Sequence, residues 1–128
     1  MKLLLDTHTF IWWDSQPNKL SQKALSLCQE PENMLLLSVA SIWEIQIKLQ
    51  LGKLKLNLPL AELIESQQKT NNLEILPITL RHVLVLESLP NPHKDPFDRL
   101  LIAQARVEDA FLVSCDPIFA QYPVKLAW

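Results

Sequence analysis

The sequence predicts an α/β domain of three layers, in which helices cover both faces of a mainly parallel sheet of about five strands. Short apolar runs of strand length alternate along the chain with segments of helical spacing, which is the order of elements in α/β proteins. The apolar runs are unbroken, as expected of strands that are buried on both faces. With 128 residues, 48% of them hydrophobic, the chain is expected to form one domain over residues 1–128.

Five segments are predicted to be strands. The first two, residues 2–5 and 34–38, are leucine-rich runs bounded by polar residues. Two shorter apolar runs follow at 75–78 and 111–114, and residues 124–126 are expected to form a last short strand.

Segments of helical spacing fill the intervals between these strands. They cover residues 7–13, 20–29, 41–51, 60–70, 79–87 and 97–109, with a short helical turn at 116–122. In the third of them Ile42, Ile45 and Leu49 share one stripe, and Gly52 is placed to end the helix. Residues 54–58 alternate leucine with lysine or asparagine, the pattern of an edge strand or an extended arm.

Composition excludes several classes of site. Because Gly52 is the only glycine, neither a phosphate-binding GxxxxGK loop nor a GxGxxG dinucleotide turn is present. The three histidines lack HExxH spacing, and no serine lies in a GxSxG motif. Cys28 and Cys115 are far apart, without the spacing of a metal site, and both are expected to be buried as small apolar residues.

No segment has the length or composition of a membrane helix, and the amino terminus does not resemble a secretory signal. We therefore expect a cytoplasmic protein with no membrane partner. The net charge of −2 gives no overall basic signature for nucleic-acid binding, although a local basic rim around an acidic centre would be compatible with it.

Acidic residues follow the predicted strands. Asp6 comes directly after the first strand and Asp116 directly after the fourth. Because parallel strands end at the same edge of a sheet, these two carboxylates are expected to lie at one edge, where α/β proteins bind ligands. Glu44 and Asp98 lie on helices that follow other strands. Four carboxylates brought together would stay ionised only around a cation, and an all-oxygen ligand set suits Mg²⁺ or Mn²⁺. Such an ion is suited to phosphodiester hydrolysis.

Each acid also has a purely structural interpretation. Asp95 with Pro96 and Asp98 resembles a helix start, with a cap, a proline at the first position and an acid in the first turn. Asp6 and Asp116 could likewise be caps. Glu44 could pair with Lys48 four residues later on a solvated face.

Other residues of possible functional interest have ordinary structural roles as the first expectation. The histidines in question, expected at the surface or in loops, are His8 and His93. The tryptophans, expected in the core rather than as base-stacking platforms, are Trp12, Trp13 and Trp43. The lysines, expected on a solvated face but able to contact a phosphate backbone, are Lys48, Lys53 and Lys55.

Four blocks of the sequence resemble the PIN-domain ribonucleases, and more closely the VapC-like toxins of bacterial type II toxin–antitoxin modules. The blocks are LLLDTHTFIWW, LLLSVASIWEIQIKLQLGKL, LPNPHKDPFDRLLIAQA and FLVSCDPIFAQY. Their order and spacing cover nearly the whole chain. The resemblance implies a PIN-like fold, endonuclease activity on RNA with Mg²⁺ or Mn²⁺, and products with a 5′-phosphate and a 3′-hydroxyl. It also implies a cognate antitoxin partner and a homodimer.

The resemblance carries the family's four acidic positions onto Asp6, Glu44, Asp98 and Asp116 as catalytic metal ligands. Ser114 matches the serine or threonine that often precedes the last aspartate by two positions. Three further residues are placed around these ligands: Asp95 as a supporting residue, and Arg99 and Lys48 as contacts to flanking phosphates. The leucine-rich segment 54–58 is a candidate contact for the antitoxin or a second copy.

Two other functions remain open on the residues alone. The first is another Mg²⁺-dependent phosphoryl hydrolase, although a phosphatase-type DxD start is absent because His8 stands two residues after Asp6. The second is a non-catalytic module that binds RNA or protein and uses its acids only as helix caps. A metal-binding nuclease is expected to gain thermal stability from Mn²⁺, whereas a module without a metal site is not.

Overall fold

The structure is a computed structural model that describes residues 1–90 and 95–128. Its centre is a five-stranded sheet in the order β3-β2-β1-β4-β5, and every neighbouring pair is parallel. The strands are β1 (Lys2–Leu5), β2 (Met34–Ser38), β3 (Glu74–Leu76), β4 (Phe111–Val113) and β5 (Leu126–Ala127). All five predicted strands are thus confirmed, each within a few residues.

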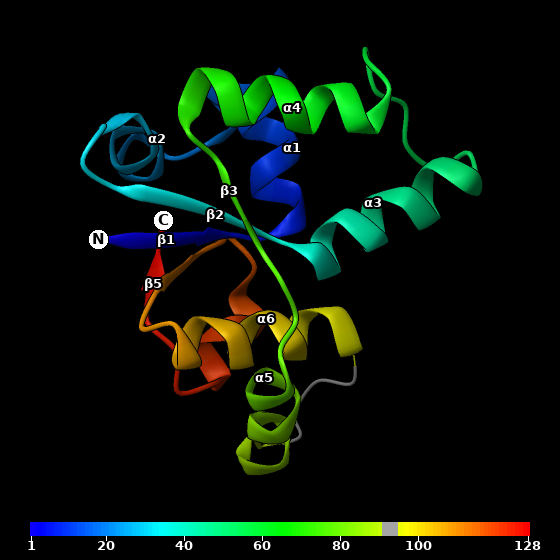
Figure 1. Ribbon diagram of the computed structural model, residues 1–128. Helices are drawn as coiled ribbons and strands as arrows, with labels where there is room; N and C mark the ends of the chain where they lie inside the picture. Colours follow the sequence, from blue (N-terminus) through cyan, green and yellow to red (C-terminus); the bar gives the residue numbers. More distant parts are fainter. Residues whose placement is uncertain (91–94) are drawn as a thin grey trace.

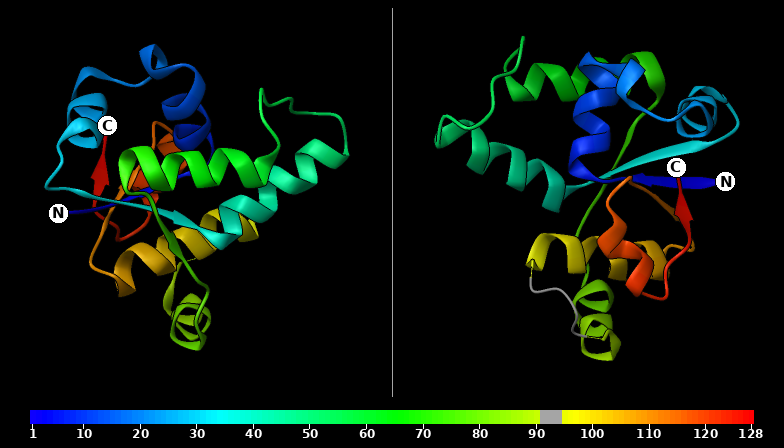
Figure 2. Two further views of the ribbon diagram at one scale, coloured as in Figure 1. Left: turned by 45° about the horizontal axis from the view of Figure 1, so that its top comes forward. Right: turned by 180° about the vertical axis from the view of Figure 1, so that it is seen from behind.

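Helices lie on both faces of this sheet, as Figures 1 and 2 show. The α-helices are α1 (Thr7–Ser15), α2 (Gln22–Gln29), α3 (Val39–Gln50), α4 (Leu60–Asn71), α5 (Leu80–Val85) and α6 (Pro96–Val107). Short 3₁₀ helices are η1 (Pro17–Lys19), η2 (Leu86–Ser88) and η3 (Pro117–Gln121). In Figure 1, α1, α2 and α4 lie above the sheet and α5 and α6 below it, which confirms the three-layer α/β/α arrangement.

Alternate side chains of the strands enter two separate cores. Leu3 and Leu5 pack with residues of α1 to α4 in a core called here the upper core, whereas Leu4 packs with residues of α6 and η3 in the lower core. All three leucines are completely buried. Successive side chains of a strand point to opposite faces, so a strand covered on both sides must be apolar at every position. This requirement explains the unbroken leucine runs in the sequence.

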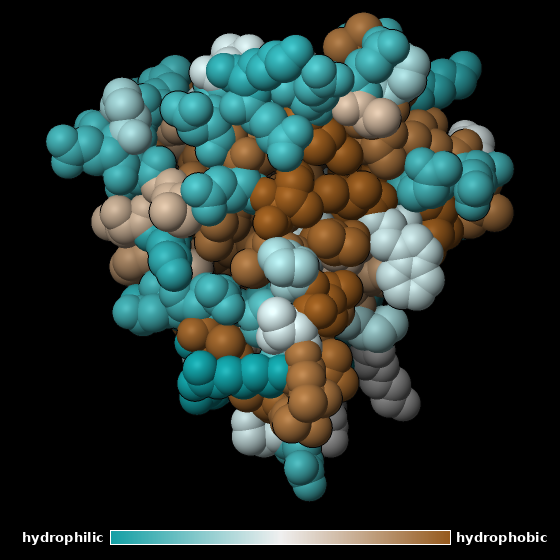
Figure 3. All heavy atoms as spheres, viewed as in Figure 1, coloured by the Kyte–Doolittle hydropathy of each residue, from teal (hydrophilic) through white to brown (hydrophobic). Residues whose placement is uncertain are grey.

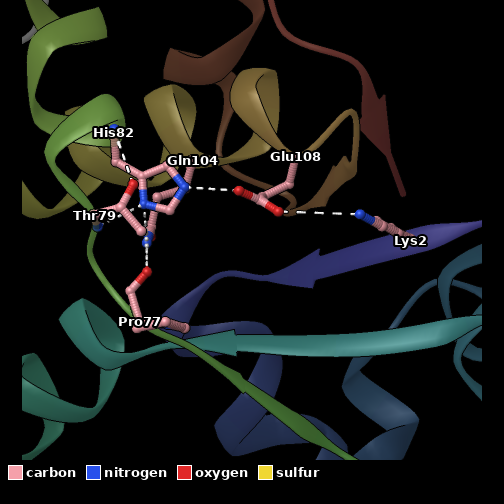
Figure 4. A network of polar contacts seen from close by, with 6 residues as sticks. All are labelled: Lys2, Pro77, Thr79, His82, Gln104 and Glu108. Carbon is pink, nitrogen blue, oxygen red and sulfur yellow. Dashed lines mark hydrogen bonds and ion pairs between the residues drawn. The ribbon is translucent and has the colours of Figure 1, made fainter.

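Helix α5 is fastened to α6 by a buried polar network (Figure 4). The ring of His82 is fully buried and lies 2.9 Å from Glu108 through Nε2. Its Nδ1 accepts a hydrogen bond of 3.0 Å from the backbone N–H of Thr79. This bond assigns the ring proton to Nε2, which then donates to Glu108. Gln104 donates from Nε2 to the carbonyl oxygen of Pro77 at 3.3 Å. The same Nε2 lies 3.3 Å from Nδ1 of His82.

Several local predictions were wrong. Of the two alternatives for residues 54–58, the edge strand is absent, and Leu54 and Leu56 pack against the upper core instead of forming an exposed apolar strip, while an extended arm is not contradicted. Trp43 is 60% exposed rather than part of the core. Cys115 is exposed, while Cys28 is buried as expected.

Two further sequence predictions can be placed against the structure. Trp12 and Trp13 are partly buried and pack against the upper core, as expected. His93 lies outside the described residues. Within the part of the chain that is described, no helix is long and apolar enough to cross a lipid bilayer.

Candidate active site

A cleft of about 290 Å³ lies at the edge of the sheet where the parallel strands end. In Figure 1 this edge faces the first turns of α3 and α6, to the right of the sheet. The four acids predicted as metal ligands all line the cleft, although they come from four separate segments of the chain. The complete lining is Asp6, Thr7, His8, Glu44, Lys48, Asp95, Asp98 and Asp116.

Asp6 is positioned by the junction between β1 and α1. Its backbone N–H donates to the carbonyl oxygen of Val113 at 3.2 Å, which extends the pairing of β1 with β4 by one residue. Its Oδ1 accepts from the backbone N–H of Thr9 at 2.8 Å and caps α1. Thr9 Oγ1 donates to the same Val113 carbonyl at 2.9 Å. The side chain of Asp6 is therefore held at the strand end and is only 8% exposed.

Asp116 is positioned in a similar way after β4. Its backbone N–H donates to Ser114 Oγ at 3.1 Å, and its Oδ1 accepts from the N–H of Ile118 at 3.0 Å. Ser114 thus shapes the turn that carries Asp116 from the strand into η3. Ser114, which the sequence analysis placed next to the predicted ligands, thus contacts the backbone of Asp116.

Asp95 caps α6, as its structural interpretation predicted. Its Oδ1 accepts from the backbone N–H groups of Phe97 and Asp98, at 2.9 and 3.2 Å, and Pro96 occupies the first helical position. The cap places Asp98 in the first turn, facing the cleft. Phe97 on the same turn contacts the ring of Trp43 on α3 at a centroid distance of 5.3 Å, so the two helix starts pack together.

Glu44 is oriented by two neighbours. Its Oε1 accepts a short 2.6 Å hydrogen bond from Thr7 Oγ1, and its Oε2 lies 3.4 Å from Lys48 Nζ. The predicted pairing with Lys48 is therefore present, but on the wall of the cleft rather than on a remote solvated face. Lys48 supplies the only lysine or arginine side chain in the lining of this cleft within the described residues.

The electrostatic effect of the carboxylates is seen at Cys115. The pKa of its thiol is raised above the ordinary value, first by partial burial and then by the negative charge of Asp6, with a smaller contribution from Asp116. Two acids that are 110 positions apart in sequence thus act on one side chain, as expected where two strands end side by side.

Arg99 was predicted to contact a flanking phosphate, and the structure places it elsewhere. Its guanidinium donates to the carbonyl oxygens of Pro90 and Leu86, at 2.7 and 3.3 Å, and lies 3.4 Å from the hydroxyl of Tyr122. It is not part of the cleft lining. Arg99 holds the chain around Leu86 and Pro90 against α6, because a guanidinium with five donors can satisfy several backbone carbonyls at once.

Two residues of the cleft were missed or undervalued in the sequence. Thr7 was not singled out, although a hydroxyl directly after an acid at a strand end is well placed to orient a second acid. His8 is exposed, as predicted, but it also lines the cleft. The sequence feature that could have identified Thr7 and His8 is their position directly after Asp6, at the end of a strand buried on both faces.

The donor chemistry of the cleft fits a hard divalent cation. Asp6, Asp95 and Asp116 use Oδ1 for their caps, which leaves Oδ2 of each carboxylate for a second interaction. Over residues 1–90 and 95–128, no three acidic, histidine or cysteine side chains are close enough to form a compact metal-binding cluster. Mg²⁺ is usually bound through one or two carboxylates and keeps several waters, so it does not require a cluster of three protein ligands.

A family model described as PIN domain matches residues 3–125. The chain belongs to the PIN-domain family. PIN domains are generally nucleases, and the acidic cleft lies at the carboxyl edge of the sheet. A comparison with curated proteins gave no match.

Solved structures of similar fold include three complexes. VapBC2 from Rickettsia felis, bound to a DNA fragment from its promoter, has a TM-score of 0.71 and 18% identity, covering 98% of this chain and 96% of that one. VapBC-1 from nontypeable Haemophilus influenzae has a TM-score of 0.60 and 17% identity, with coverages of 94% and 91%. A toxin–antitoxin complex from Klebsiella pneumoniae has a TM-score of 0.54 and 17% identity, with coverages of 94% and 92%. At these identities the likeness establishes the shared PIN fold over nearly the whole length of each chain.

Proposed function

We propose that this PIN-domain protein is a metal-dependent endoribonuclease that acts as the toxin of a type II toxin–antitoxin pair. The observation that supports the proposal best is the convergence of Asp6, Glu44, Asp98 and Asp116 in one cleft from four separate segments. Helix capping alone accounts for Asp6 and Asp116, but it does not explain why Glu44, in the interior of α3, joins them.

In this proposal the four acids hold Mg²⁺ or Mn²⁺, with Asp6 as the most enclosed ligand. An ion held by these residues would supply an activated water molecule and positive charge to offset the charge that develops on the scissile phosphate. The remaining residues act on the acids. Thr7 orients Glu44 through its hydroxyl, and Ser114 holds the turn that presents Asp116.

Lys48 is proposed to contact substrate. Its ammonium group lies 3.4 Å from Glu44 at the mouth of the acidic cleft, where it offsets part of the negative charge that would repel a phosphate. No cysteine, serine or threonine side chain is required as a nucleophile, because the attacking group is water.

The proposed partners are an RNA substrate, a cognate antitoxin and a second copy of the chain, with no role for a membrane and a cytoplasmic location. The antitoxin is supported by the fold, because a complex of similar structure is described as a toxin with its antitoxin. Self-association is supported by large apolar side chains that stay exposed on this chain alone, including Trp43, Leu80 and Leu84. Figure 3 shows apolar residues gathered in a band across the face of the molecule that Figure 1 presents.

The direct test is cleavage of end-labelled small RNA by antitoxin-free protein in Mn²⁺, Mg²⁺ or EDTA. We expect discrete fragments with 5′-phosphate ends in either metal, none in EDTA, and none from the Asp6→Asn variant. Asp109→Asn is the matched control, because the same chemical change is made at an exposed acid outside the cleft.

A second readout does not depend on knowing the RNA target. Mn²⁺ at millimolar concentration is expected to raise the melting temperature of the wild type and of Asp109→Asn, since a ligand that binds only the folded state stabilises it. Asp6→Asn is expected to lose most of this shift. A wild-type melting curve that Mn²⁺ leaves unmoved would contradict the metal site and favour a module that only binds.

A further inference from the structure

Two further hollows follow the acidic cleft along the surface, each sharing lining residues with the one before it. The first, of about 400 Å³, shares His8 and Lys48 with the acidic cleft and lies between α1 and the segment that follows α3. The second, of about 250 Å³, shares Ile11, Ser15, Gln16 and Lys55 with the first. The two neighbouring hollows are together called here the basic groove, and their lining includes Trp12, Gln16, Lys48, Lys53, Lys55 and Asn57.

The charge of the basic groove is opposite to that of the cleft it adjoins. Lys53 and Lys55 are both exposed, and within the described residues neither has a carboxylate within the 4.0 Å of an ion pair. The one acid in the lining, Asp14, accepts a 2.8 Å hydrogen bond from the neutral amide of Gln67 through its Nε2. Within the described residues the basic groove thus carries two lysines without an ion-pair partner, Lys53 and Lys55, against one carboxylate, Asp14, so the balance of charge in its lining is positive although the net charge of the protein is −2.

The lysines are held in register by the end of α3. Lys53 donates its backbone N–H to the carbonyl oxygen of Lys48 at 2.9 Å, and Gly52 between them turns the chain with a φ of 70°. Leu54 and Leu56, which alternate with the lysines, pack against the upper core and fix the segment. The alternation of leucine with polar residues, which predicts an edge strand or an extended arm, thus anchors two leucines inward while the lysines remain outside.

The other lining groups suit unpaired bases better than a duplex. Trp12 and His8 form a ring pair at the start of the basic groove, with centroids 5.9 Å apart, and Gln16 and Asn57 add amide donors and acceptors farther along. Proteins bind single strands by combining a positively charged groove with aromatic rings and with polar groups that reach base edges. Double-stranded RNA is recognised mainly through shape and backbone contacts across its minor groove, which a recess of this kind does not provide.

We propose that the basic groove binds a single-stranded stretch of RNA that leads to the scissile phosphate in the acidic cleft. Lys53 and Lys55 contact backbone phosphates and Lys48 marks the junction with the catalytic site. This inference deepens the proposed function and rests on it for the identity of the reaction. The binding step itself requires no metal, so it can be tested separately.

The test measures binding of a fluorescent single-stranded RNA of about 12 nucleotides in EDTA, by anisotropy over a range of salt concentrations. The variant is Lys53→Gln with Lys55→Gln, and the matched control is Lys23→Gln with Lys69→Gln, two exposed lysines outside the basic groove. We expect weaker binding only for the groove variant. The slope of log affinity against log salt should fall by about 0.7 for each phosphate contact that is lost.

Two results would overturn the proposal. The first is a result in which the groove variant and the control behave alike. An equal loss of affinity in both would mean that RNA binding follows net charge, and no loss in either would mean that the RNA binds elsewhere. The second is lysine-dependent binding of poly-glutamate as tightly as RNA, which would assign the basic groove to an acidic protein segment instead.

Cleavage in Mn²⁺ separates this inference from the proposed function. If the wild type cleaves RNA and the groove variant binds RNA as tightly as the wild type, RNA binding in the basic groove is contradicted and the proposed nuclease activity is supported. If RNA binding depends on the groove lysines but the wild type cleaves no RNA, RNA binding in the basic groove is supported and the proposed nuclease activity is contradicted.

Discussion

At the scale of single residues, Asp6 combines a structural and a chemical role. One carboxylate oxygen caps α1 through the N–H of Thr9, and the same side chain lines the acidic cleft. Asparagine caps a helix about as well as aspartate, because its side-chain oxygen accepts the same hydrogen bond without the charge. The two roles can therefore be separated by substitution.

We predict that Asp6→Asn keeps the stability of the metal-free protein, whereas Asp6→Ala loses about 1 kcal/mol with the cap. Both variants are expected to lose RNA cleavage, since both remove the charge. Urea unfolding in EDTA measures the difference in stability. Equal loss of stability in the two variants would mean that the fold, and not only the chemistry, needs the charge.

The buried thiol of Cys28 predicts a dependence of stability on alkaline pH. Burial raises the pKa of Cys28 to about 11. As pH rises through the lower pKa of the unfolded thiol, the unfolded chain releases a proton that the folded chain keeps. Stability is therefore complete below the unfolded pKa and falls toward pH 11, by at most about 1.4 kcal/mol per pH unit.

The measurement compares the wild type with Cys28→Ala between pH 8 and pH 10.5. Other groups titrate in both proteins, so only the difference in slope reports Cys28. We expect the wild type to lose more stability over this range, after allowing for the offset that the smaller side chain causes. Parallel curves would contradict a raised pKa in the folded state.

At the scale of secondary structure, the end of α3 depends on Gly52. The residue has a φ of 70°, in the left-handed region, and a Cβ placed there would meet no atom within 4 Å. The cost of replacing it is therefore in the backbone and not in packing. The turn also sets the direction in which Lys53 and Lys55 leave the helix.

We predict that Gly52→Ala lowers the free energy of unfolding by about 1 kcal/mol, the usual cost of a left-handed conformation for a residue with a Cβ. Gly52→Asn is expected to cost less, because asparagine adopts this conformation more readily. Thermal or urea unfolding of the two variants checks the order. An alanine variant as stable as the wild type would contradict the positive φ at this position.

At the scale of the whole molecule, the PIN fold leaves an apolar face uncovered. Leu80 and Leu84 lie one turn apart on α5 and are 74% and 62% exposed, although the helix is firmly attached to α6 through His82. Exposed apolar side chains that share one helix face indicate a surface that is covered in an assembly. A second copy of the chain is the occupant proposed above.

We predict that Leu80→Lys with Leu84→Lys halves the mass measured by light scattering, because it places charge in the centre of the contact between two copies. The matched control is Leu51→Lys, which also replaces a 62% exposed leucine but lies at the end of α3. A wild type that is monomeric at every concentration would contradict the assignment. Equal effects of the control and the α5 variant would place the contact elsewhere.

The sequence by itself determined the α/β class, a mainly parallel sheet of about five strands, and the expectation that Asp6, Glu44, Asp98 and Asp116 meet at one edge of it. Leucine at every position of β1 and β2 can be satisfied only by a strand covered on both faces, and parallel strands bring their following residues to one edge. Local chemistry was also readable where it depends on neighbours in sequence, as in the Asp95 cap of α6 and the turn at Gly52.

Only the tertiary structure decided which of the remaining side chains reach the cleft. Arg99 and Lys48 looked alike in the sequence as phosphate contacts, but packing turned Arg99 toward the carbonyls of Leu86 and Pro90 and left Lys48 at the cleft. Trp43, expected in the core, is 60% exposed, and its ring contacts Phe97 at the start of α6. The reason is physical: strand order and strand ends follow from local burial patterns, whereas the direction of a long side chain depends on contacts between segments that the sequence keeps apart.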